Sequence, residues 1–387
     1  MSWLEELAAD AAALKSAGRL RVLREIAPEP HGRAVYHGRR YCNFSGNDYM
    51  GISGDAELRR KFYEQYAADL STPELAQSRA SSRLLTGNTP AYNRLERTLS
   101  ELYNGRSALV FNSGYHTNIG VLPALARSGD LILSDKLNHA SIIDGLKLAD
   151  AEFRRYPHLD LEQLEKQLAA KRAAYRQVFI VTESVFSMDG DLADLRKLVE
   201  LKEKYDAVLV VDEAHSVGVR GPRGTGLAAE LGVAGKVDVL IGTFGKAFGS
   251  TGAYAIMEPE VREYLVNHMR SLIFTTGLPP VVLNWSDFVL RHAAEMDAER
   301  AKLKRMSDRL RAIFTAAGVK TDGDSQIVPF MVGEDRDAEL MAEKFQDNGF
   351  LVFPIRPPTV PAHTSRLRFS LTAALDESDI EAVGKLL

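Results

Sequence analysis

Three short segments carry side chains that could do chemistry, and each follows an apolar run. They are F-N-S-G-Y-H at 111–116, V-V-D-E-A-H-S at 210–216 and T-F-G-K-A-F-G at 243–249. Lys246 lies among small residues, where removal from water would favour its neutral, nucleophilic amine. Asp212 ends an apolar strand, where a buried carboxylate is costly unless a cation or a donor meets it. The sequence therefore offers a lysine nucleophile together with a carboxylate that needs a cationic partner.

This pair matches the requirements of pyridoxal 5'-phosphate (PLP). PLP draws electrons from a carbanion into its pyridine ring, which requires a lysine to hold the aldehyde and a carboxylate to keep the ring nitrogen protonated. The alternatives are a surface lysine in a Gly-rich turn and an aspartate that caps a loop. A nucleotide phosphate loop is not indicated, because Ala247 follows Lys246 where that motif has Ser or Thr. The three segments together favour PLP, with Lys246 and Asp212 as catalytic residues.

Further side chains near these segments could complete a cofactor site. Ser113, Gly114 and Tyr115 open a helical pattern, so their backbone N–H groups could bind a phosphate at the positive end of the helix dipole. An ordinary helix N-cap is the alternative for Ser113. His215 could contact the phenolic oxygen of PLP and His139 could stack on its ring, while a structural histidine is the alternative for each.

The elements that must position these residues follow a βαβ pattern. Apolar, β-rich runs alternate with helical patterns at Ala108–Asn112, Leu131–Ser134, Val178–Thr182, Ala207–Val211 and Asp238–Thr243. Strands without polar alternation indicate a mostly parallel sheet covered by helices on both faces. Ligands of such α/β folds bind at the carboxyl ends of the strands, where the three segments lie.

A second, smaller unit is expected after this sheet. Helical spacing from Val281 to Gly318 predicts one long helix that leaves the large domain. A compact α+β unit should follow, with a helix near Ala338–Asn348 and strands at Ile327–Val332, Leu351–Phe353 and Leu367–Leu371. An N-terminal helix, Trp3–Ser16, is expected to pack on this unit or on a partner. The predicted division is 1–50 for an N-terminal arm, 51–280 for the large domain and 281–387 for the linking helix and small domain.

Composition narrows the classes of protein. A chain of 387 residues with 45% hydrophobic and 26% charged residues can bury a large core and is not expected to be disordered. Its net charge of −4 gives no general reason to bind nucleic acid, and the basic run at 301–311 is typical of a solvated helix face. One cysteine excludes an intrachain disulfide and a multi-cysteine metal site. We expect no metal, no signal peptide, no membrane segment and a cytoplasmic location.

The run T-E-S-V-F-S-M-D-G-D at 182–191, followed by the 211–218 and 243–249 segments, resembles the α-oxoamine synthases along nearly the whole chain. These are PLP-dependent transferases of fold type I that condense an amino acid with an acyl thioester of CoA or an acyl-carrier protein. The resemblance implies a homodimer with active sites at the subunit interface. It also implies that Lys246 holds PLP, Asp212 faces the ring nitrogen, His139 stacks on the ring and His215 contacts the phenolic oxygen.

Several further roles follow from the resemblance alone. Glu183 and Ser187 match residues that line the cofactor site, and Thr243 matches a phosphate ligand. Thr275 and Thr276 match a stretch that reaches the phosphate from the neighbouring subunit. Asn47 and Arg368 match groups that hold the amino-acid carboxylate. An arginine suits the carboxylate because its planar fork can bind both oxygens.

Substrate choice within the family is indicated by the segment at 355–374, which resembles the biotin-pathway member that joins L-alanine to a pimeloyl thioester. Arg21 and Arg356 become candidates for the terminal carboxylate of the acyl chain or the phosphates of its carrier, with an exposed arginine that binds nothing as the alternative. His363 and Leu375 replace the usual glycine and histidine of that member. Glycine with acetyl-CoA, 5-aminolaevulinate synthesis and sphingoid-base synthesis remain alternatives within the class.

The expected reaction begins when L-alanine displaces Lys246 from PLP. The freed Lys246 removes the α-proton, the carbanion attacks the thioester, and the resulting β-keto acid loses CO2 after the thiol carrier has left. A non-catalytic PLP-fold partner subunit is the alternative from another class, and it is disfavoured because Lys246 and Asp212 are both present.

Overall fold

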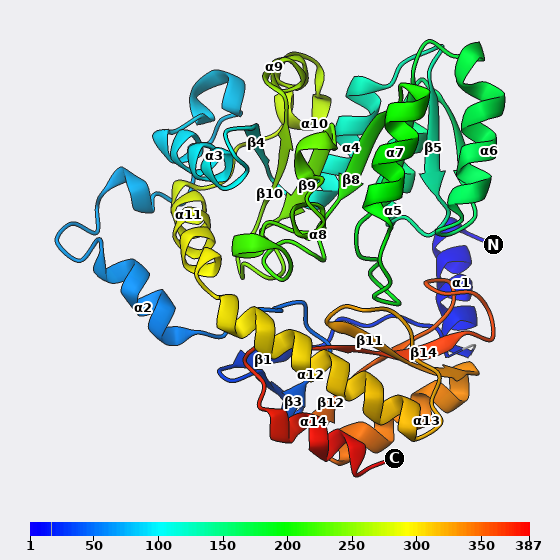
Figure 1. The fold of residues 1–387 in the computed structure, drawn as a ribbon. Helices are drawn as coiled ribbons and strands as arrows, with labels where there is room; N and C mark the ends of the chain where they lie inside the picture. The colour runs from blue at the N-terminus through cyan, green and yellow to red at the C-terminus, as the bar shows by residue number, and fades with distance from the viewer. Residues whose placement is uncertain (17) are drawn as a thin grey trace.

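A seven-stranded sheet forms the centre of the larger part of the molecule in the computed structural model, which describes residues 1–16 and 18–387 (Figure 1). Across the sheet the strands are β4 (Ser107–Phe111), β10 (Ala253–Met257), β9 (Val239–Thr243), β8 (Val208–Asp212), β7 (Val178–Glu183), β5 (Leu131–Asp135) and β6 (Glu152–Tyr156). Only β10 runs antiparallel to its neighbours. The predicted α/β class with a mostly parallel sheet is confirmed.

All five strands expected in this region form, and two further strands join them. Residues of β5, β7 and β9 are buried throughout, as both-sided coverage of a parallel sheet requires. In β6 only Tyr156 is buried, so this edge strand lacks the apolar run that sequence analysis relies on. The antiparallel strand β10 is fully buried. Its apolar run is too short for periodicity alone to distinguish a strand from a buried helical segment.

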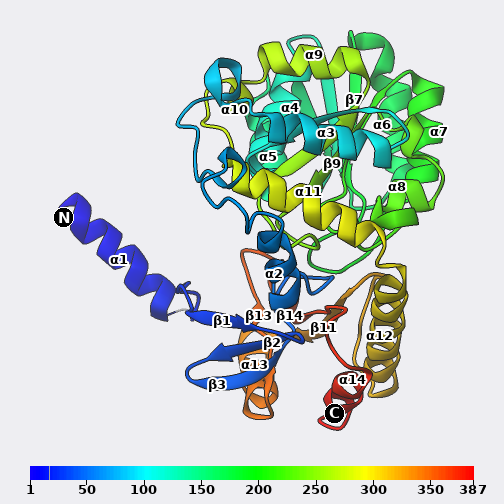
Figure 2. The ribbon, with the colours of Figure 1, turned by 90° about the vertical axis from the view of Figure 1, so that its left-hand side faces the viewer.

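Helices cover both faces of the sheet (Figures 1 and 2). One face packs against α4 (Gly114–Leu125), α5 (Ala140–Leu148), α9 (Pro259–His268) and α10 (Arg270–Ile273). The other packs against α3 (Pro90–Leu102), α6 (Leu161–Lys171), α7 (Leu195–Tyr205), α8 (Leu227–Glu230) and α11 (Pro280–Ala294). Alternate residues of one strand serve the two cores, as Leu109 and Val110 do in β4.

The prediction of one long helix from Val281 to Gly318 is wrong. The segment forms α11, which packs on α3, and α12 (Asp297–Ala316), which packs on the smaller unit. Neither Glu295 nor Met296 between them is a Gly or Pro that would signal the break. Buried Arg300 stabilises this break by donating to the carbonyls of Ala293 at 2.6 Å and Ala294 at 3.2 Å in the last turn of α11.

The smaller unit combines both ends of the chain. Its three-stranded antiparallel sheet contains β11 (Ile327–Gly333), β14 (Ser365–Ser370) and β13 (Pro354–Ile355), covered by α12, α13 (Asp335–Asp347) and α14 (Glu377–Gly384). A second sheet joins the N-terminal strands β1 (Ile26–Glu29), β2 (Arg33–Tyr36) and β3 (Arg39–Asn43) to β12 (Phe350–Leu351). The expected α+β organisation is confirmed, although β12 ends at Leu351, so Val352 and Phe353 lie outside the strand expected at Leu351–Phe353.

The N-terminal helix α1 forms over the predicted residues, Trp3–Ser16, but none of them is buried. Figure 2 shows that α1 extends away from the rest of the chain, and Trp3 is 71% exposed. Its expected packing on the small domain of its own chain is therefore wrong, while packing on a partner stays a prediction. The predicted domain boundaries also stay predictions.

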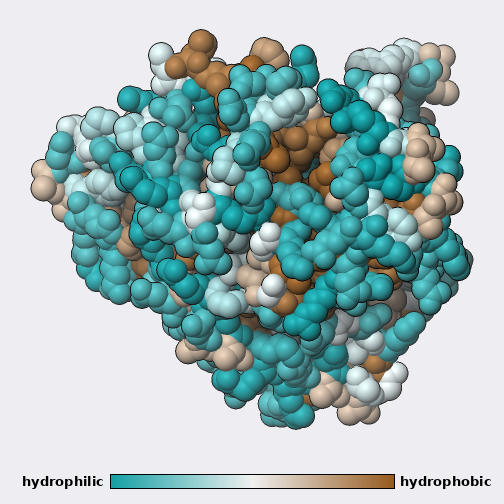
Figure 3. All heavy atoms as spheres, turned by 45° about the horizontal axis from the view of Figure 1, so that its top comes forward, coloured by the Kyte–Doolittle hydropathy of each residue, from teal (hydrophilic) through white to brown (hydrophobic). Residues whose placement is uncertain are grey.

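The connections contain one longer helix, α2 (Ala56–Glu64), and short helical turns. The turns lie at Pro73–Leu75, Arg83–Gly87, Arg172–Ala174, Pro222–Gly224 and Ala234–Lys236. No helix within the described residues is long and apolar enough to cross a bilayer. Polar side chains cover most of the face seen in Figure 3.

Candidate active site

The carboxyl edge of the large sheet gathers most of the residues proposed from the sequence. Glu183 ends β7, Asp212 ends β8 and Thr243 ends β9, while α4 and α5 begin just after β4 and β5. In this parallel sheet Glu183 lies directly beside Asp212, and Thr243 lies two residues beyond Ile241, the partner of Asp212 on β9. The smaller unit approaches the same edge through β14, as the contacts of Arg368 below demonstrate.

Lys246 lies in the loop that connects β9 with β10. Buried side chains of Phe244, Ala247 and Phe248 anchor this loop, and the Gly249 N–H donates to the Lys246 carbonyl at 3.0 Å. The Lys246 Nζ lies 2.8 Å from His215 Nε2. Burial lowers the pKa of Lys246 below its ordinary value, and nearby Asp212 opposes this shift only in part. The loop therefore holds a nucleophilic amine at a fixed place.

His215 joins Lys246 to a second group of residues. Its Nδ1 lies 2.6 Å from the Tyr49 hydroxyl, and its backbone carbonyl accepts from Gln326 at 2.8 Å. Burial, together with the positive charges of Lys246 and Arg368, holds the pKa of His215 well below its ordinary value. A neutral imidazole can accept at one nitrogen and donate at the other, so His215 can relay hydrogen bonding between Tyr49 and the lysine amine.

Asp212 receives two hydrogen bonds that fix its carboxylate. Its Oδ2 accepts from Asn118 Nδ2 at 2.7 Å, and its Oδ1 accepts from the Ala214 N–H at 2.9 Å. Asn118 is buried in α4 and also donates to the Ser141 hydroxyl at 2.9 Å. Neither bond supplies a positive charge, so the carboxylate keeps its need for a cationic partner.

His139 and Glu183 form the opposite side of this cluster. His139 caps α5 and contacts the Ser141 hydroxyl through Nδ1 at 2.8 Å, while its backbone N–H donates to Glu183 Oε1 at 2.5 Å. Burial lowers the pKa of His139. Burial and the neighbouring Asp212 raise the pKa of Glu183, because its charged form is poorly solvated there.

The N-terminus of α4 forms a candidate phosphate site. Ser113 caps the helix, with its hydroxyl accepting from the His116 N–H at 3.1 Å, so the N-cap alternative for its side chain is confirmed. A Cβ on Gly114 would lie 3.9 Å from that of Thr243 and would fill the space between the helix and β9. Tyr115 contributes only its backbone here, because its hydroxyl donates to Asp144 at 2.6 Å and its side chain is half exposed.

Thr275 and Thr276 lie beside the same helix terminus. Asn112 Nδ2 donates to the Thr275 hydroxyl at 3.3 Å and to the Thr276 carbonyl at 2.7 Å. Asn112 directly precedes Ser113. The Thr276 side chain is exposed, so it is open to a neighbouring subunit. Service to a partner's phosphate remains a proposal.

Arg368 reaches the cluster from β14. Its Nη2 donates to Asn47 Oδ1 and to the Tyr49 hydroxyl, both at 3.2 Å, and its Nε donates to the Ser187 carbonyl at 2.5 Å. Within the described residues, Nη1 has no hydrogen-bond partner, although Arg368 is only 8% exposed. A carboxylate would satisfy this nitrogen. Ser187 contributes to the network through its backbone rather than its side chain.

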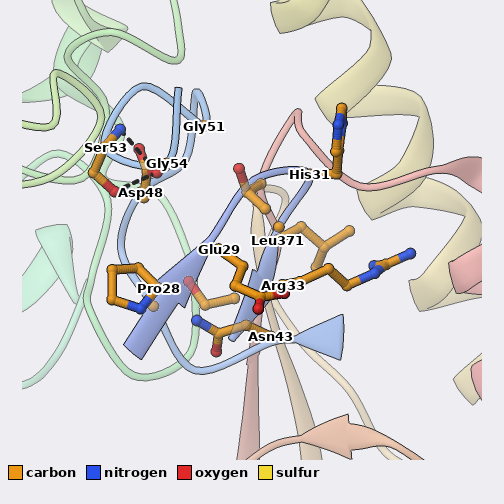
Figure 4. Close-up of a pocket in the computed structure, with 14 residues that line it drawn as sticks. Pro28, Glu29, His31, Arg33, Asn43, Asp48, Gly51, Ser53, Gly54 and Leu371 are labelled. Atoms are coloured by element: carbon orange, nitrogen blue, oxygen red, sulfur yellow. Dashed lines mark hydrogen bonds between the residues drawn. The ribbon is translucent and has the colours of Figure 1, made fainter. Parts of the chain in front are cut away.

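The turn that carries Asn47 and Tyr49 is fixed by Asp48, whose Oδ2 accepts from the Ser53 N–H at 3.1 Å and the Ser53 hydroxyl at 2.6 Å (Figure 4). Beside this turn lies a polar cavity of about 60 Å³, lined in part by Asn43 and Arg33. That volume holds water molecules rather than an amino acid. None of Lys246, His215, Tyr49 and Arg368 lines this cavity, so it is separate from the reacting centre.

Comparison with known proteins identifies the family. The model for "Aminotransferase class I and II" matches residues 41–385. The chain belongs to this family. It is 50% identical over 383 residues to an 8-amino-7-oxononanoate synthase from Chlorobaculum parvum, covering 99% of this chain and 98% of that one.

Two solved structures resemble this aminotransferase-family chain. A serine palmitoyltransferase variant from S. paucimobilis with bound PLP–myriocin aldimine has a TM-score of 0.90 and 29% identity, covering 100% of this chain and 97% of its own. The 8-amino-7-oxononanoate synthase from Francisella tularensis has a TM-score of 0.75 and 29% identity, covering 89% and 96%. The predicted α-oxoamine synthase resemblance is thereby confirmed.

The side chains of this family member fit PLP. A buried amine with a lowered pKa can hold its aldehyde, Asp212 can face its ring nitrogen, and the start of α4 beside Thr243 offers N–H donors to its phosphate. Thr243 already has partners within the protein, because its hydroxyl donates to the Gly252 carbonyl and accepts from the Gly245 N–H, each at 3.1 Å. The site residues are thus matched in kind to the cofactor expected from the sequence.

Sequence reasoning missed two residues of the site in this aminotransferase-family chain. Tyr49 links His215 with Arg368, and it lies only two positions after Asn47 in a motif already noted. Asn118 orients Asp212 from one turn inside α4, where no motif distinguishes it from a core residue. Its polarity within an otherwise buried helical stretch was the available signal.

Arg21 and Arg356 are not joined to the cluster by hydrogen bonds in the described part of the chain. Exposed Arg21 donates to the Thr359 hydroxyl at 3.3 Å. Arg356 donates to the Gly18 carbonyl at 2.7 Å and pairs with Glu339. The two arginines nevertheless lie near each other, since Thr359 N–H donates to the Arg356 carbonyl at 3.1 Å. Their predicted contact with the acyl donor stays a prediction.

Proposed function

We propose that the chain catalyses the decarboxylative condensation of L-alanine with a pimeloyl thioester, giving 8-amino-7-oxononanoate, CO2 and the free thiol carrier. The observation that carries this proposal is the hydrogen-bonded set Lys246–His215–Tyr49–Arg368, which places a nucleophilic amine and a carboxylate-binding guanidinium in one site. The chain-long likeness to 8-amino-7-oxononanoate synthases supports the choice of acyl group. This function places the enzyme in biotin biosynthesis.

PLP, when bound, supplies an electron sink for negative charge on the α-carbon of the amino acid. Lys246 would hold the cofactor and Asp212 would face its ring nitrogen, with Asn118 keeping the Asp212 carboxylate oriented. His139 would lie against the ring, and Glu183 and Ser187 would line the site. The phosphate of the cofactor would be held by Thr243 and by the backbone of the residues that open α4, which are Ser113, Gly114 and Tyr115.

The chain's own groups then bind and orient L-alanine. Arg368 and Asn47 hold its carboxylate, which fixes the α-hydrogen relative to Lys246. Lys246 takes this proton at Nζ, because burial favours the neutral amine. His215 stays neutral and steers that nitrogen from 2.8 Å. The α-carbon then attacks the thioester carbonyl and displaces the thiol carrier. The carboxylate beside the new ketone leaves as CO2, and the α-carbon takes a proton in its place.

The acyl chain of the donor ends in a second carboxylate, which requires a cation away from the reacting centre. Arg21 suits this role better than Arg356, because its recorded side-chain partner is a neutral hydroxyl whereas Arg356 is already paired with Glu339. Either a CoA or an acyl-carrier-protein thioester satisfies this scheme.

The working unit in this proposal is a homodimer. Thr275 and Thr276 serve the phosphate of the neighbouring site, and the exposed helix α1 contacts the partner. The proposed place of action is the cytoplasm, and neither nucleic acid nor a membrane takes part. Sedimentation of an active monomer would contradict the dimer but leave the chemistry standing.

The deciding experiment crosses L-alanine, glycine and L-serine with pimeloyl-, acetyl-, succinyl- and palmitoyl-CoA, using PLP-loaded protein and mass spectrometry of the products. We expect 8-amino-7-oxononanoate from the first pair and none from a Lys246→Ala variant. Glycine with acetyl-CoA as the best pair would retain the family chemistry and reject the proposed substrates. L-Serine with palmitoyl-CoA as the best pair would do the same in favour of sphingoid-base synthesis.

A further inference from the structure

His158 lies outside the cluster described above, yet both of its ring nitrogens contact carboxylates. Its Nδ1 lies 2.9 Å from Asp135 Oδ1, and its Nε2 lies 2.5 Å from Asp191 Oδ2. The ring also meets the edge of Phe186, with 4.4 Å between centroids and an interplanar angle of 85°. Such a bracket between two acids fixes the imidazole in position and orientation.

The first carboxylate of this bracket is part of the rigid sheet. Asp135 ends β5, is fully buried, and accepts from the Leu137 N–H at 2.8 Å and the Leu159 N–H at 2.9 Å. Burial disfavours a charge on His158, but the hydrogen bonds to Asp135 and Asp191 outweigh it and raise the pKa of His158 to about 10. The histidine is thus a cation at neutral pH, bound to the edge of the sheet.

The second carboxylate belongs to a tight loop, 186–191. The Phe186 N–H donates to the Asp191 carbonyl, and the Gly190 N–H donates to the Phe186 carbonyl, each at 3.0 Å. Gly190 has a φ of +71°, and a Cβ there would lie 2.3 Å from the Ile327 carbonyl oxygen. Little room is therefore left for the loop to shift without disturbing β11.

Two arginines of β14 hold the same loop from the other side. Arg366 pairs with Asp189, and Arg368 donates through Nε to the Ser187 carbonyl at 2.5 Å. Residues two apart on a strand point to the same face, so both guanidinium groups meet the loop together. The loop is a bridge between the large sheet, through His158, and the arginine that reaches Asn47 and Tyr49.

We propose that His158 is a positioning residue: it fixes loop 186–191 on the sheet so that the Ser187 carbonyl aims Arg368 at the carboxylate of the amino-acid substrate. This inference rests on the proposed function, in which Arg368 binds that carboxylate. Without the bracket, the carbonyl that orients Nε moves, and the guanidinium loses its fixed direction.

The test uses full-length, PLP-loaded protein carrying His158→Gln, with His268→Gln as a matched control on an exposed helix end. Binding is followed through the cofactor's absorption during titration with L-alanine and with L-alaninamide, which lacks the carboxylate. We expect His158→Gln to weaken L-alanine binding by about fivefold or more, as for partial loss of a charge-assisted hydrogen bond. Affinity for L-alaninamide, the starting absorption spectrum and the KM for the acyl donor should stay unchanged.

Equal weakening of both ligands, or unchanged L-alanine affinity, would overturn the proposal and leave His158 as a stabilising contact only. If His158→Gln does not fold, Asp191→Asn is judged by the same two affinities, because it weakens the loop side of the bracket alone. An error in the proposed function would instead be seen in the wild-type protein, without any substitution. If L-alanine causes no spectral change there, the comparison is repeated with glycine and glycinamide, which still tests the bracket.

Discussion

Replacement of Asn118 with Leu should misorient the Asp212 carboxylate without creating a large cavity in the core. Leucine has the same branched skeleton of four side-chain heavy atoms as asparagine, so the change leaves no large cavity. It removes the 2.7 Å bond to Asp212 Oδ2 and the 2.9 Å bond to Ser141. Asn118 is 3% exposed and Asp212 7%, so water cannot easily replace the lost donor.

The expected magnitude follows from these two bonds. A hydrogen bond to a charged acceptor contributes about 1.5–3 kcal/mol, and the neutral bond to Ser141 adds about 0.5–1.5 kcal/mol. Unfolding of the cofactor-free protein in urea should therefore show a loss of about 2–4.5 kcal/mol. If misorientation of Asp212 costs even the charged bond alone in the transition state, kcat/KM falls by about 10–150-fold.

Ser141→Ala is the matched control, because it leaves the bond from Asn118 to Asp212 in place while it removes the second acceptor of Asn118 and the hydroxyl contact to His139 Nδ1, which keeps the Ser141 N–H at 3.2 Å. Its kcat/KM should fall far less than that of Asn118→Leu. Equal kinetic losses in the two variants, or Asn118→Leu with wild-type kinetics, would refute the view that Asn118 acts through Asp212.

Three further outcomes are expected. Borohydride should bleach the protein and fix the cofactor on Lys246 in a peptide map, and a label on another lysine would reject that assignment. Arg368→Lys should raise the KM for L-alanine by about tenfold or more, since one ammonium cannot keep the bonds to Ser187, Asn47 and Tyr49 and also donate to the carboxylate, while the KM for the acyl donor should stay unchanged. The free energy of unfolding of the wild type should exceed that of His158→Gln by its full amount below about pH 6.5, and this difference should disappear as pH rises through about 10, because folding raises the pKa of His158. Urea unfolding at a series of pH values measures the difference. A difference that stays constant with pH would contradict this reasoning.

The sequence could predict those parts of the site whose chemistry is local. Lys246 and Asp212 each follow an apolar strand, and parallel winding brings such strand ends together whatever the details of the helices. Tyr49 could not be assigned in this way, because its role depends on the N-terminal segment meeting β14, a contact across more than half the chain. Pairing of this kind has no local signal.

The helices and strands, like the site residues, were predictable only where their sequence signal is local. Apolar runs predict the strands that are buried on both faces, whereas β6 contains a single buried residue and has no such run. The break between α11 and α12 depends on Arg300 capping carbonyls in the preceding helix, and the helical periodicity continues across it. No residue of α1 is buried on its own chain, and a local helical pattern predicts the helix but not the surface that it meets.

The pairing of β3 with β12 can form only after most of the chain has been synthesised. Phe350 pairs with Cys42 and Leu351 with Asn43, so strands from the two ends of the chain share one sheet. On a ribosome that adds about 5–20 residues per second, β3 waits roughly 15–60 s for its partner to emerge. The seven strands of the large sheet lie between them and are complete by Met257. The nascent chain thus carries an open strand edge beside a finished large sheet, and that edge is where a ribosome-associated chaperone has most to protect.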